Sequence, residues 1–441
     1  MKKYIKIQSK INSFNNTITV NGDKSISIRC VLLASQAIGT SKIYNLLESE
    51  DVLDTLKCIN KLGIKYKKIN SHYQIYGLGL NGFKTKRKLE INAGNSGTLA
   101  RLISGLLINS KNQITIKGDK SLSKRDFTRV TKPLKLFGAN FISKNKSLPL
   151  KILGSEFLRP IKYNEKLGSA QCKSSVMFAA LKTPGITKIK AKKSRNHTEL
   201  LFKFLNIPIK LIKKPNFDYI DIKGISNFGA FKYTVPGDIS SCSFFIVLTL
   251  MTKNSKIIIK NVNTNKTRTG IVSILKKMNA NIIFKNKRLY NGEEVSDILV
   301  ESTAYLNGIN CPKKFNSSAI DEFLVIFLAA AKAKGVSKFH DLGELNKKES
   351  PRLDFAIKLL RKFGITVLRD KDNVTIYGNP NLELKGNFII KNYRKDHRVF
   401  MMSCIAALSL GGKWKIFDTD SIKTSFPDFI KKIETLGANI T

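Results

Sequence analysis

The sequence is poor in acidic residues and lacks several patterns that mark common protein classes. Its six cysteines are scattered with no CxxC pair, which argues against a disulfide framework or a zinc site and favours reduced thiols. No apolar run approaches the about 20 residues that span a bilayer. Residues 1–7 lack the apolar core of a secretory signal. We therefore expect a cytoplasmic protein with no metal and no membrane anchor.

The shortage of acidic residues leaves a large positive charge, because 77 Lys and Arg stand against 32 Asp and Glu, a net charge of +45. A nucleic-acid-binding protein is one interpretation. However, the lysines are spread along the whole chain, and there is no zinc finger, basic zipper or RNP aromatic pair. A lysine-rich surface without a specific nucleic-acid partner is therefore favoured, and RNA binding stays open as an alternative. In either case the charge should attract small anions.

What the sequence does contain is an internal repeat. Its 441 residues, 42% of them hydrophobic, suffice for two or three domains with substantial cores. Six times, an amphipathic helix-like segment ends at Gly or Asn and runs into a short apolar strand. These two residue types suit the left-handed backbone that follows a helix C-terminus. The six predicted helix ends are Gly63, Gly138, Asn206, Asn279, Gly364 and Gly437.

A second mark precedes each helix end by 37 to 43 residues, where small or capping residues stand in front of an apolar run. This pattern is typical of a helix start. The marks, spaced 71 to 81 residues apart, are Ser25, Ser96, Ser169, Ser240, Asp321 and Asp396. If the repeats stack with approximate symmetry, the N–H groups and dipoles of these helices face a common region that attracts anions. A structural solenoid with polar caps is the alternative.

Some segments around these marks suit the binding of phosphate and carboxylate groups. Ser25 and Arg29 lie four residues apart, on one face of a predicted helix. Gly97 would let a ligand approach the backbone closely. The segment ESPR at 349–352 is interpreted as a carboxylate, an N-cap serine, a proline at the first helical position and an arginine entering a helix. Each of these signals is weak when taken alone.

Nine such motifs, taken together and in this order, resemble the 5-enolpyruvylshikimate-3-phosphate (EPSP) synthase family of enolpyruvyl transferases. The motifs are NGDKSISIR (21–29), NAGNSGT (92–98), SAQCKSS (169–175), SRNHTE (194–199), VPGDISS (235–241), IDE (320–322), KESPR (348–352), DHR (396–398) and SFPD (425–428). They cover almost the whole chain. The form of the SRNHTE motif is closer to the second bacterial class of the family.

The resemblance implies an α/β (α+β) fold of two domains, an inside-out α/β barrel with helices inside and sheets outside. Six βαβαββ repeats, three in each domain, agree with the six repeats found from spacing. Domain I would comprise residues 1–21 plus 236–441, and domain II residues 22–235. The active site would lie in the interdomain cleft and be completed when the domains close.

The resemblance also implies the chemistry. The family transfers the enolpyruvyl group of phosphoenolpyruvate to the 5-hydroxyl of shikimate 3-phosphate and releases phosphate, without a metal or cofactor, usually as a monomer. Asp321 matches the aspartate assigned to the substrate hydroxyl, and Glu349 matches the glutamate near the methylene carbon. Lys24 matches a lysine that touches both substrates and assists proton transfer. These three residues are the predicted catalytic groups.

The other matched positions fall into two sets, in which arginines suit phosphate and carboxylate groups because they are forked and permanently charged. The predicted shikimate 3-phosphate set is Lys24, Ser25, Arg29, Ser169, Gln171, Ser194, Asp321 and Lys348. The predicted phosphoenolpyruvate set is Lys24, Gly97, Arg125, Gln171, Arg352 and Arg398. We expect Arg101, His197 and His397 to have structural roles.

The sequence departs from the family pattern at a few positions. Ala170 stands where many members have a second serine, and Thr424 stands where some have a lysine that contacts phosphoenolpyruvate. Lys423 lies one place early, so we do not expect it to contact this substrate. Gly97 matches a glycine that leaves room for the inhibitor glyphosate, which predicts sensitivity to it.

The nearest rival is the enolpyruvyl transferase that acts on UDP-N-acetylglucosamine, because it shares the fold and the repeats. That enzyme usually depends on a reactive residue, commonly cysteine, in a mobile loop of the second domain. Here Cys30, Cys58 and Cys172 lie in or beside predicted helices, and the KESPR motif favours shikimate 3-phosphate.

Overall fold

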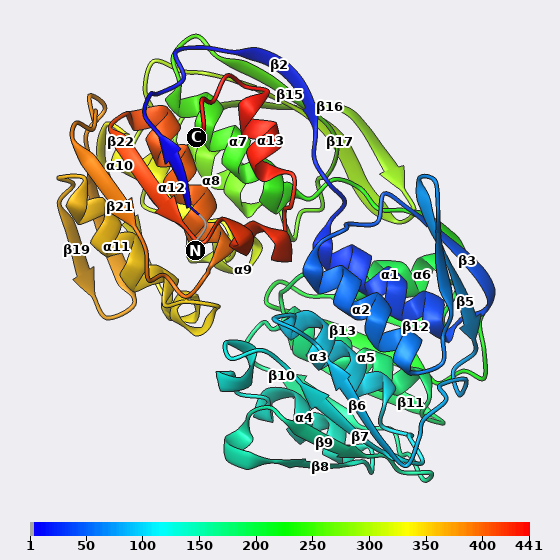
Figure 1. Cartoon of the computed structure of the whole chain (residues 1–441). Coiled ribbons are helices and arrows are strands. Elements are labelled where there is room, and N and C mark those ends of the chain that lie inside the picture. The colour runs from blue at the N-terminus through cyan, green and yellow to red at the C-terminus, as the bar shows by residue number, and fades with distance from the viewer. Residues whose placement is uncertain (1–3) are drawn as a thin grey trace. The chain divides into compact units, whose positions relative to one another are not determined.

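A computed structural model describes residues 4–441, and the chain divides into two compact units (Figure 1). Unit 1 comprises Met1–Asn21, Pro236–Leu289 and Glu294–Thr441, and unit 2 comprises Gly22–Val235 and Tyr290–Glu293. Residues 1–3, which the sequence analysis assigned to domain I, lie outside the described residues. The chain therefore leaves unit 1 after Asn21 and returns to it after Val235.

Unit 2 repeats one pattern of strands and helices three times. Its helices are α1 (Lys24–Gln36), α2 (Glu50–Lys61), α3 (Gly97–Leu106), α4 (Thr128–Leu136), α5 (Ala170–Leu181) and α6 (His197–Phe204). Its strands are β3 (Ile38–Tyr44), β4 (Tyr66–Ile69), β5 (His72–Leu78), β6 (Lys88–Asn92), β7 (Gln113–Lys117), β8 (Asn140–Ser143), β9 (Leu150–Leu153), β10 (Lys162–Glu165), β11 (Ile186–Lys192), β12 (Ile209–Lys213), β13 (Phe217–Lys223) and β14 (Lys232–Thr234). They form the sheets β14-β3-β5-β4, β6-β7-β9-β8 and β10-β11-β13-β12. The order β6-α3-β7-α4-β8-β9 is the predicted βαβαββ repeat.

Unit 1 follows the same plan. Its helices are α7 (Ile239–Met251), α8 (Gly270–Lys277), α9 (Asn316–Ala319), α10 (Phe323–Ala331), α11 (Arg352–Lys362), α12 (His397–Leu410) and α13 (Phe429–Glu434). Its strands are β1 (Tyr4–Ile7), β2 (Asn15–Thr19), β15 (Lys256–Asn263), β16 (Asn281–Tyr290), β17 (Glu293–Glu301), β18 (Gly335–Phe339), β19 (Val367–Asp370), β20 (Asn373–Gly378), β21 (Asn387–Ile390) and β22 (Lys413–Phe417). They form the sheets β16-β17-β15-β2, β18-β20-β19 and β1-β22-β21. Isolated bridges extend the two three-stranded sheets, as between Ile7 and Ile440.

Strands far apart in sequence complete one sheet in each unit. In unit 1, β2 runs parallel to β15, with Ile18 opposite Ile259. In unit 2, β14 runs parallel to β3, with Tyr233 opposite Ile43. In unit 2 a strand from the end of the unit's sequence thus completes the first sheet, whereas in unit 1 the whole of Gly22–Val235 is inserted between the two paired strands.

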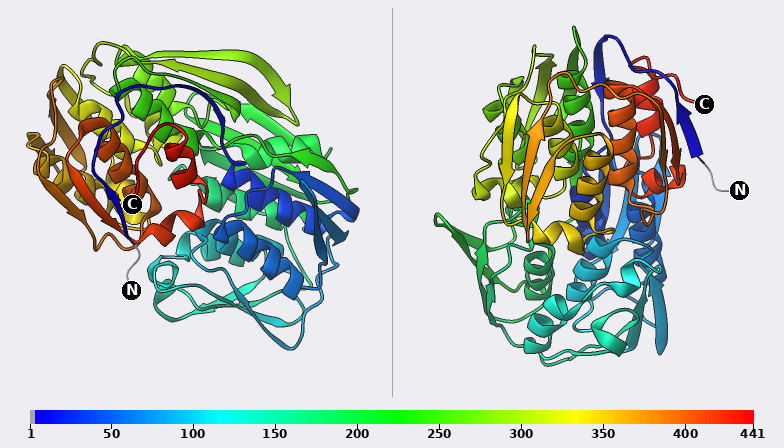
Figure 2. Two further views of the ribbon diagram at one scale, coloured as in Figure 1. Left: turned by 45° about the horizontal axis from the view of Figure 1, so that its top comes forward. Right: turned by 90° about the vertical axis from the view of Figure 1, so that its left-hand side faces the viewer.

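In each unit the helices are grouped inside and the strands lie around them (Figures 1 and 2). Every residue of α7 and of α10 is buried, as expected for helices that are apolar on all sides. In unit 1 these two helices pack against each other and against α12, and in unit 2 α3 packs against α5. Within residues 4–441 no helix has both the length and the apolar character needed to cross a membrane.

All six predicted helix ends are confirmed by the backbone. Each has a positive φ, between 54° at Asn206 and 117° at Gly138. These residues follow α2, α4, α6, α8, α11 and α13, the second helix of each repeat. A positive φ at this position lets the backbone N–H groups bond to the last carbonyls of the helix.

The predicted helix starts are confirmed, since a helix begins within a few residues of each mark. Only three of the six marked residues, however, are N-caps. The hydroxyls of Ser96 and Ser169 and the carboxylate of Asp396 accept hydrogen bonds from the first turns of α3, α5 and α12. The caps of α1 and α7 lie two residues before the marked serines, at Asp23 and Asp238. In both motifs the aspartate carboxylate accepts the hydrogen bond from the first turn of the helix. The hydroxyl of the serine two residues later is therefore left for another partner.

Asp321 is a correction of a different kind, because α10 begins two residues later at Phe323, with Glu322 in the cap position. The short helix α9 ends at Ala319, so Asp321 lies in the turn between two helices. Asp321 therefore stands one residue before the cap position of α10.

Two lysines occupy equivalent positions at the other ends of the central helices. Lys182 follows α5 and donates from Nζ to the carbonyl of Leu106, the last residue of α3, at 2.9 Å. Lys332 follows α10 and donates to the carbonyl of Met251, the last residue of α7, at 3.3 Å. The last carbonyls of a helix have no partner within it and carry its negative dipole end. Burial lowers the pKa of Lys182 to about 7.

This pKa predicts how stability depends on pH. Because the pKa of Lys182 in the folded protein lies below its unfolded value, the unfolded chain binds the extra proton between about pH 7 and 10. The free energy of unfolding should therefore rise across this window, relative to Lys182→Met, by up to about 1.4 kcal/mol per pH unit. Urea denaturation at pH 7 and pH 9 measures the difference.

The control is Lys111→Met, because the side chain of Lys111 is 80% exposed. This variant should keep the pH dependence of the wild type. Parallel pH profiles for the wild type and Lys182→Met would show that Lys182 titrates as it does in the unfolded chain.

Candidate active site

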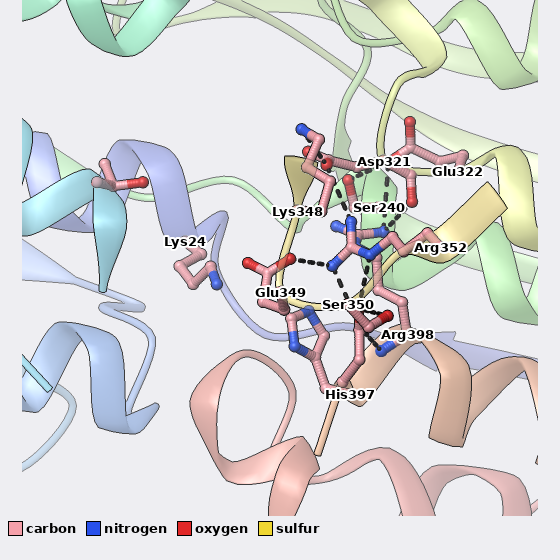
Figure 3. Close-up of polar contacts among 12 residues, drawn as sticks. Lys24, Ser240, Asp321, Glu322, Lys348, Glu349, Ser350, Arg352, His397 and Arg398 are labelled. Carbon is pink, nitrogen blue, oxygen red and sulfur yellow. Dashed lines mark hydrogen bonds and ion pairs between the residues drawn. The ribbon is translucent and has the colours of Figure 1, made fainter. Parts of the chain in front are cut away.

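Arg352, the first residue of α11, lies buried among carboxylates of unit 1 (Figure 3). Its Nε donates to Asp396 Oδ2 at 2.9 Å, and its Nη2 donates to Glu349 Oε2 at 2.5 Å. Its Nη1 lies 3.4 Å from Asp321 Oδ1, and only 2% of the side chain is exposed. The structure thus brings together three residues that the sequence predicted for the site, namely Asp321, Glu349 and Arg352.

The electrostatics of this cluster keep its central pair charged. Burial alone would lower the pKa of Arg352, but Asp396, Glu349 and Asp321 raise it above its ordinary value. Burial would raise the pKa of the Asp396 carboxyl, but Arg352 and His397 together hold that pKa below its usual range. An ion pair with several hydrogen bonds is the arrangement in which a buried charge is tolerated.

Ser350 has a different role from the one predicted. The sequence suggested that it caps α11, but the helix begins after Pro351, and the Ser350 hydroxyl donates to Asp396 Oδ2 at 2.8 Å. The carboxylate of Asp396 therefore holds the start of α12, the serine and the guanidinium of Arg352 at once. This one side chain links the starts of α11 and α12.

The turn at Asp321 gathers two further residues of the predicted site. Lys348 Nζ lies 3.2 Å from Asp321 Oδ1. Arg398, in the first turn of α12, donates from Nη1 to the backbone carbonyl of Asp321 at 2.6 Å. In unit 1, five predicted residues therefore form one continuous set of polar contacts: Asp321, Lys348, Glu349, Arg352 and Arg398.

In unit 2, Lys24 and Arg29 lie on the first helix, α1. Lys24 Nζ pairs with Asp51 Oδ2 at 2.9 Å. Arg29 is 2% exposed and donates to the hydroxyls of Thr198 and Ser174 at 2.8 and 2.9 Å. It also donates to the carbonyl of Ser25, so the spacing of four places both residues on one face, as predicted.

The starts of α3 and α5 in unit 2 are joined by Arg101. Its Nη1 donates to the carbonyl of Gly97 and to Gln171 Oε1, at 3.2 and 2.8 Å. The Gln171 amide in turn donates to Thr98 at 2.9 Å. Arg101 thus has the structural pairs that the sequence predicted, and they hold Gln171. Arg125 lies close to Gly97, since a Cβ at Gly97 would stand 3.1 Å from its Nη1.

Two serines of the predicted site differ in how their hydroxyls are satisfied. Ser169 caps α5 and accepts from the Cys172 N–H at 3.3 Å. Ser194, which follows β11, is 5% exposed, and its hydroxyl has no hydrogen-bond partner among the described residues. A buried hydroxyl without a partner is costly, and a bound ligand would satisfy it.

The two histidines inside motifs are engaged elsewhere. His197 Nδ1 lies 2.6 Å from Glu293 Oε1, and both side chains are fully buried. Glu293 belongs to the segment Tyr290–Glu293, which the sequence analysis did not assign to this unit. His397 Nδ1 lies 3.3 Å from the hydroxyl of Thr424, the position where some relatives have lysine.

Sequence reasoning missed several partners of these residues. Asp51, Ser174 and Thr198 belong to no predicted ligand set, and Asp396 was marked only as a helix start. Each lies 27 to 169 residues from the cation that it meets. The signal that could have found Thr198 and Ser174 is their position inside the SRNHTE and SAQCKSS motifs.

The cysteines give no sign of a thiol-dependent site. All six are free and buried, and burial raises the pKa of Cys58 to about 12. A thiol with a raised pKa is a poor nucleophile. Within residues 4–441 no group of three or more His, Cys, Asp or Glu side chains is placed to hold a metal ion.

Comparison with known proteins defines the class. The structure is similar to EPSP synthase from Acinetobacter baumannii, with a TM-score of 0.87 and 33% identity over 100% of this chain and 99% of that one. It is also similar to the enolpyruvyl transferase NikO from Streptomyces tendae, with a TM-score of 0.77 at 14% identity, over 100% and 98% of the chains. The fold is therefore that of the enolpyruvyl transferases, with two domains of mixed α/β structure, as predicted.

Within this class the sequence identifies the family. Residues 8–433 match the family EPSP synthase (3-phosphoshikimate 1-carboxyvinyltransferase). The chain is 40% identical to the 3-phosphoshikimate 1-carboxyvinyltransferase of Ruthia magnifica subsp. Calyptogena magnifica, over 97% of both chains. It is 38% identical to that of Petrotoga mobilis, over 96% of this chain and 97% of the relative. The chain belongs to the EPSP synthase family, as its motifs predicted.

The Arg352 cluster predicts a large stability effect of a small change. Asp396→Asn keeps a side-chain oxygen for the helix cap but removes the charge that balances Arg352. We expect a loss of about 3 kcal/mol in the free energy of unfolding, because breaking a buried pair leaves a buried charge behind. Urea denaturation at neutral pH measures the loss.

The matched control is Asp354→Asn, in which a carboxylate with 49% exposure loses its pairing with Arg369. Exposed pairs contribute little, so this variant should lose less than about 1 kcal/mol. Equal losses in the two variants would contradict the importance assigned to the buried pair.

Proposed function

We propose that this chain transfers the enolpyruvyl group of phosphoenolpyruvate to the 5-hydroxyl of shikimate 3-phosphate, with release of phosphate. The observation that carries the proposal is the cluster in unit 1. There, the cationic groups of Lys348, Arg352 and Arg398 contact the turn at Asp321, and Arg352 also holds Glu349. A reaction between two phosphorylated acids that needs proton transfer requires this combination of cations and carboxylates.

Three cations of the predicted site are matched with carboxylates of the protein. Lys24 pairs with Asp51, Lys348 with Asp321, and Arg352 with Glu349 as well as Asp396. Anionic substrates would therefore exchange with these carboxylates. Such an exchange keeps every buried charge compensated, before and after binding. The net charge of +45 favours the approach of anions.

In this proposal the two carboxylates have separate roles. Asp321 takes the proton from the 5-hydroxyl as the oxygen attacks phosphoenolpyruvate. Glu349 leaves Arg352 when the substrate carboxylate takes its place, receives a proton from Lys24, and delivers that proton to the methylene carbon. Glu349 then takes a proton back from the methyl group while Asp321 gives its proton to the departing phosphate, which regenerates the double bond.

The phosphate of shikimate 3-phosphate would be bound by unit 2. The support is the Ser194 hydroxyl, which is buried and has no partner among the described residues. Ser25, Arg29, Ser169 and Gln171 complete the proposed set in this unit. Gly97, Arg125 and Gln171 would contact phosphoenolpyruvate from unit 2, together with Arg352 and Arg398 from unit 1.

The cellular setting is also a proposal. Free, buried thiols at all six cysteines are consistent with the cytoplasmic location that the sequence predicts. We further propose a monomer that meets its two small substrates without a nucleic-acid or membrane partner.

The proposed reaction predicts phosphate release only when both substrates are present. A phosphate assay with each substrate omitted in turn tests this, and a further arm supplies UDP-N-acetylglucosamine as the acceptor. The proposal would be overturned if phosphoenolpyruvate released phosphate with UDP-N-acetylglucosamine but not with shikimate 3-phosphate. Release of phosphate with no acceptor present would overturn it as well. Asp321→Asn and Glu349→Gln should each lower kcat by about 10²–10⁴-fold, the usual contribution of a general acid or base.

The control is Asp341→Asn, whose carboxylate is 62% exposed and pairs with Lys313. It should retain wild-type kcat. Urea denaturation should show that all three variants remain folded. Full activity in folded Asp321→Asn would exclude that residue as the base.

Gly97 generates a separate prediction about glyphosate. A Cβ at Gly97 would stand 2.6 Å from Arg101 Nη1 and 3.1 Å from Arg125 Nη1, so alanine must displace one guanidinium or both. Gly97→Ala should therefore raise the glyphosate inhibition constant and the KM for phosphoenolpyruvate. A factor of at least about ten for the inhibitor is expected from one methyl group in a tight pocket.

Gly229→Ala is the matched control, because a Cβ there meets nothing within 4 Å. Steady-state kinetics with varied phosphoenolpyruvate and glyphosate compare the three proteins. An inhibition constant unchanged in Gly97→Ala would show that this glycine does not border the inhibitor pocket.

A further inference from the structure

The start of α7 carries a serine for which the sequence suggested no role beyond capping. The hydroxyl of Ser240 donates to Glu322 Oε1 and accepts from Arg268 Nη2, the latter at 2.8 Å. The cap itself is Asp238, whose Oδ1 accepts from the Ser240 N–H at 2.8 Å and from Arg268 Nη2 at 2.9 Å. Ser240 therefore joins Arg268 to the carboxylate that precedes α10.

This chain of contacts is buried and holds one arginine and two carboxylates. Asp238, Ser240, Arg268 and Glu322 are each at most 7% exposed. Because Arg268 donates to Asp238 and Ser240, its positive charge is compensated by groups of the protein itself. Glu322 also lies near a second arginine, since Arg398 Nη1 is 3.7 Å from Glu322 Oε1.

Arg398 is the more accessible of the two arginines, with 11% of its side chain exposed against 2% for Arg268. The separation of 3.7 Å from Glu322 is longer than that of a strong charge-assisted hydrogen bond. The same Nη1 donates to the Asp321 carbonyl at 2.6 Å (Figure 3). The position of Glu322 thus bears on how much of Arg398 is available to an anion.

We propose that Ser240 is a positioning residue for phosphoenolpyruvate. By donating to Glu322, its hydroxyl satisfies a carboxylate that would otherwise draw closer to Arg398 and compete with the substrate. The inference rests on the proposed function, in which Arg398 binds phosphoenolpyruvate. It adds Ser240, Arg268 and Glu322 as the groups that hold Arg398 ready.

The test is Ser240→Ala, measured by phosphate release with each substrate varied in turn. Glu322 loses a hydrogen-bond donor and closes on Arg398, so the KM for phosphoenolpyruvate should rise by roughly tenfold, the effect of one hydrogen bond to a charged group. The KM for shikimate 3-phosphate and kcat should change by less than about twofold. Ser240→Thr, which keeps a hydroxyl, should restore much of the loss.

Ser403→Ala is the matched control for a buried serine. Its hydroxyl donates to the Val399 carbonyl at 2.8 Å within α12, outside this chain of contacts. It should lose comparable stability in urea and leave the KM for phosphoenolpyruvate unchanged. If both variants raise that KM equally, the effect is general loosening of the fold, and the positioning role is wrong.

A double-mutant cycle separates action through Arg398 from other effects. In an Arg398→Lys background, Ser240→Ala should raise the KM for phosphoenolpyruvate by less than about threefold, because the group that Ser240 acts through is already altered. A full tenfold effect in that background would overturn the proposal.

The wild-type protein distinguishes the two levels of inference. If it releases no phosphate with both substrates, the proposed function itself fails. If it is active and Ser240→Ala has a wild-type KM for phosphoenolpyruvate, only the role of Ser240 fails.

Discussion

A buried helix start must find acceptors for backbone N–H groups that have none within the helix, and unit 1 packs three such helices together. Acidic residues stand at all three starts, Asp238 before α7, Glu322 before α10 and Asp396 before α12. Carboxylates buried in this way need cations, and Arg268, Arg398 and Arg352 are the cations that they meet. Asp238 and Asp396, whose carboxylates cap α7 and α12, therefore also hold arginines.

Unit 2 solves the same problem with one carboxylate, Asp23 at the start of α1, and with neutral groups at two other helices. Serines cap α3 and α5, and Arg29 donates to the hydroxyls of Ser174 and Thr198. A hydroxyl can turn from one partner to another without leaving a buried charge uncompensated. The two units thus offer different environments for anions. Unit 1 has arginines balanced by carboxylates, whereas unit 2 combines the Lys24–Asp51 ion pair with hydroxyl groups that can change partners.

The sequence predicted what depends on local chemistry. The six left-handed helix ends follow from Gly and Asn at fixed distances, and the nine motifs were specific enough to identify the family. The caps were placed less well, because Asp23 and Asp238 compete with the serines two residues on, and only the backbone geometry decides between them. Asp321 looked like a cap since it precedes an apolar run, yet the intervening turn leaves its carboxylate for Lys348 and Arg352.

The partners of the charged residues could not be predicted because they are remote in sequence. Glu322 lies 82 residues from Ser240, and Asp396 lies 44 residues from Arg352. Neither hydrophobic periodicity nor capping rules relate such positions. Burial adds to the difficulty, since Arg268 belongs to none of the motifs and would be taken for a surface charge in a chain with 77 basic residues.

The pairing of β2 with β15 also has a consequence for the order of events during synthesis. Residues 15–19 leave the ribosome first, but their partner begins at Lys256, after the whole of Gly22–Val235 has been made. At a synthesis rate of about 5–20 residues per second, β15 is made roughly 10–50 s after β2. Its sequence, NNTIT, has one apolar residue, Ile18, and so polar a strand is a poor template for association with other chains during that time.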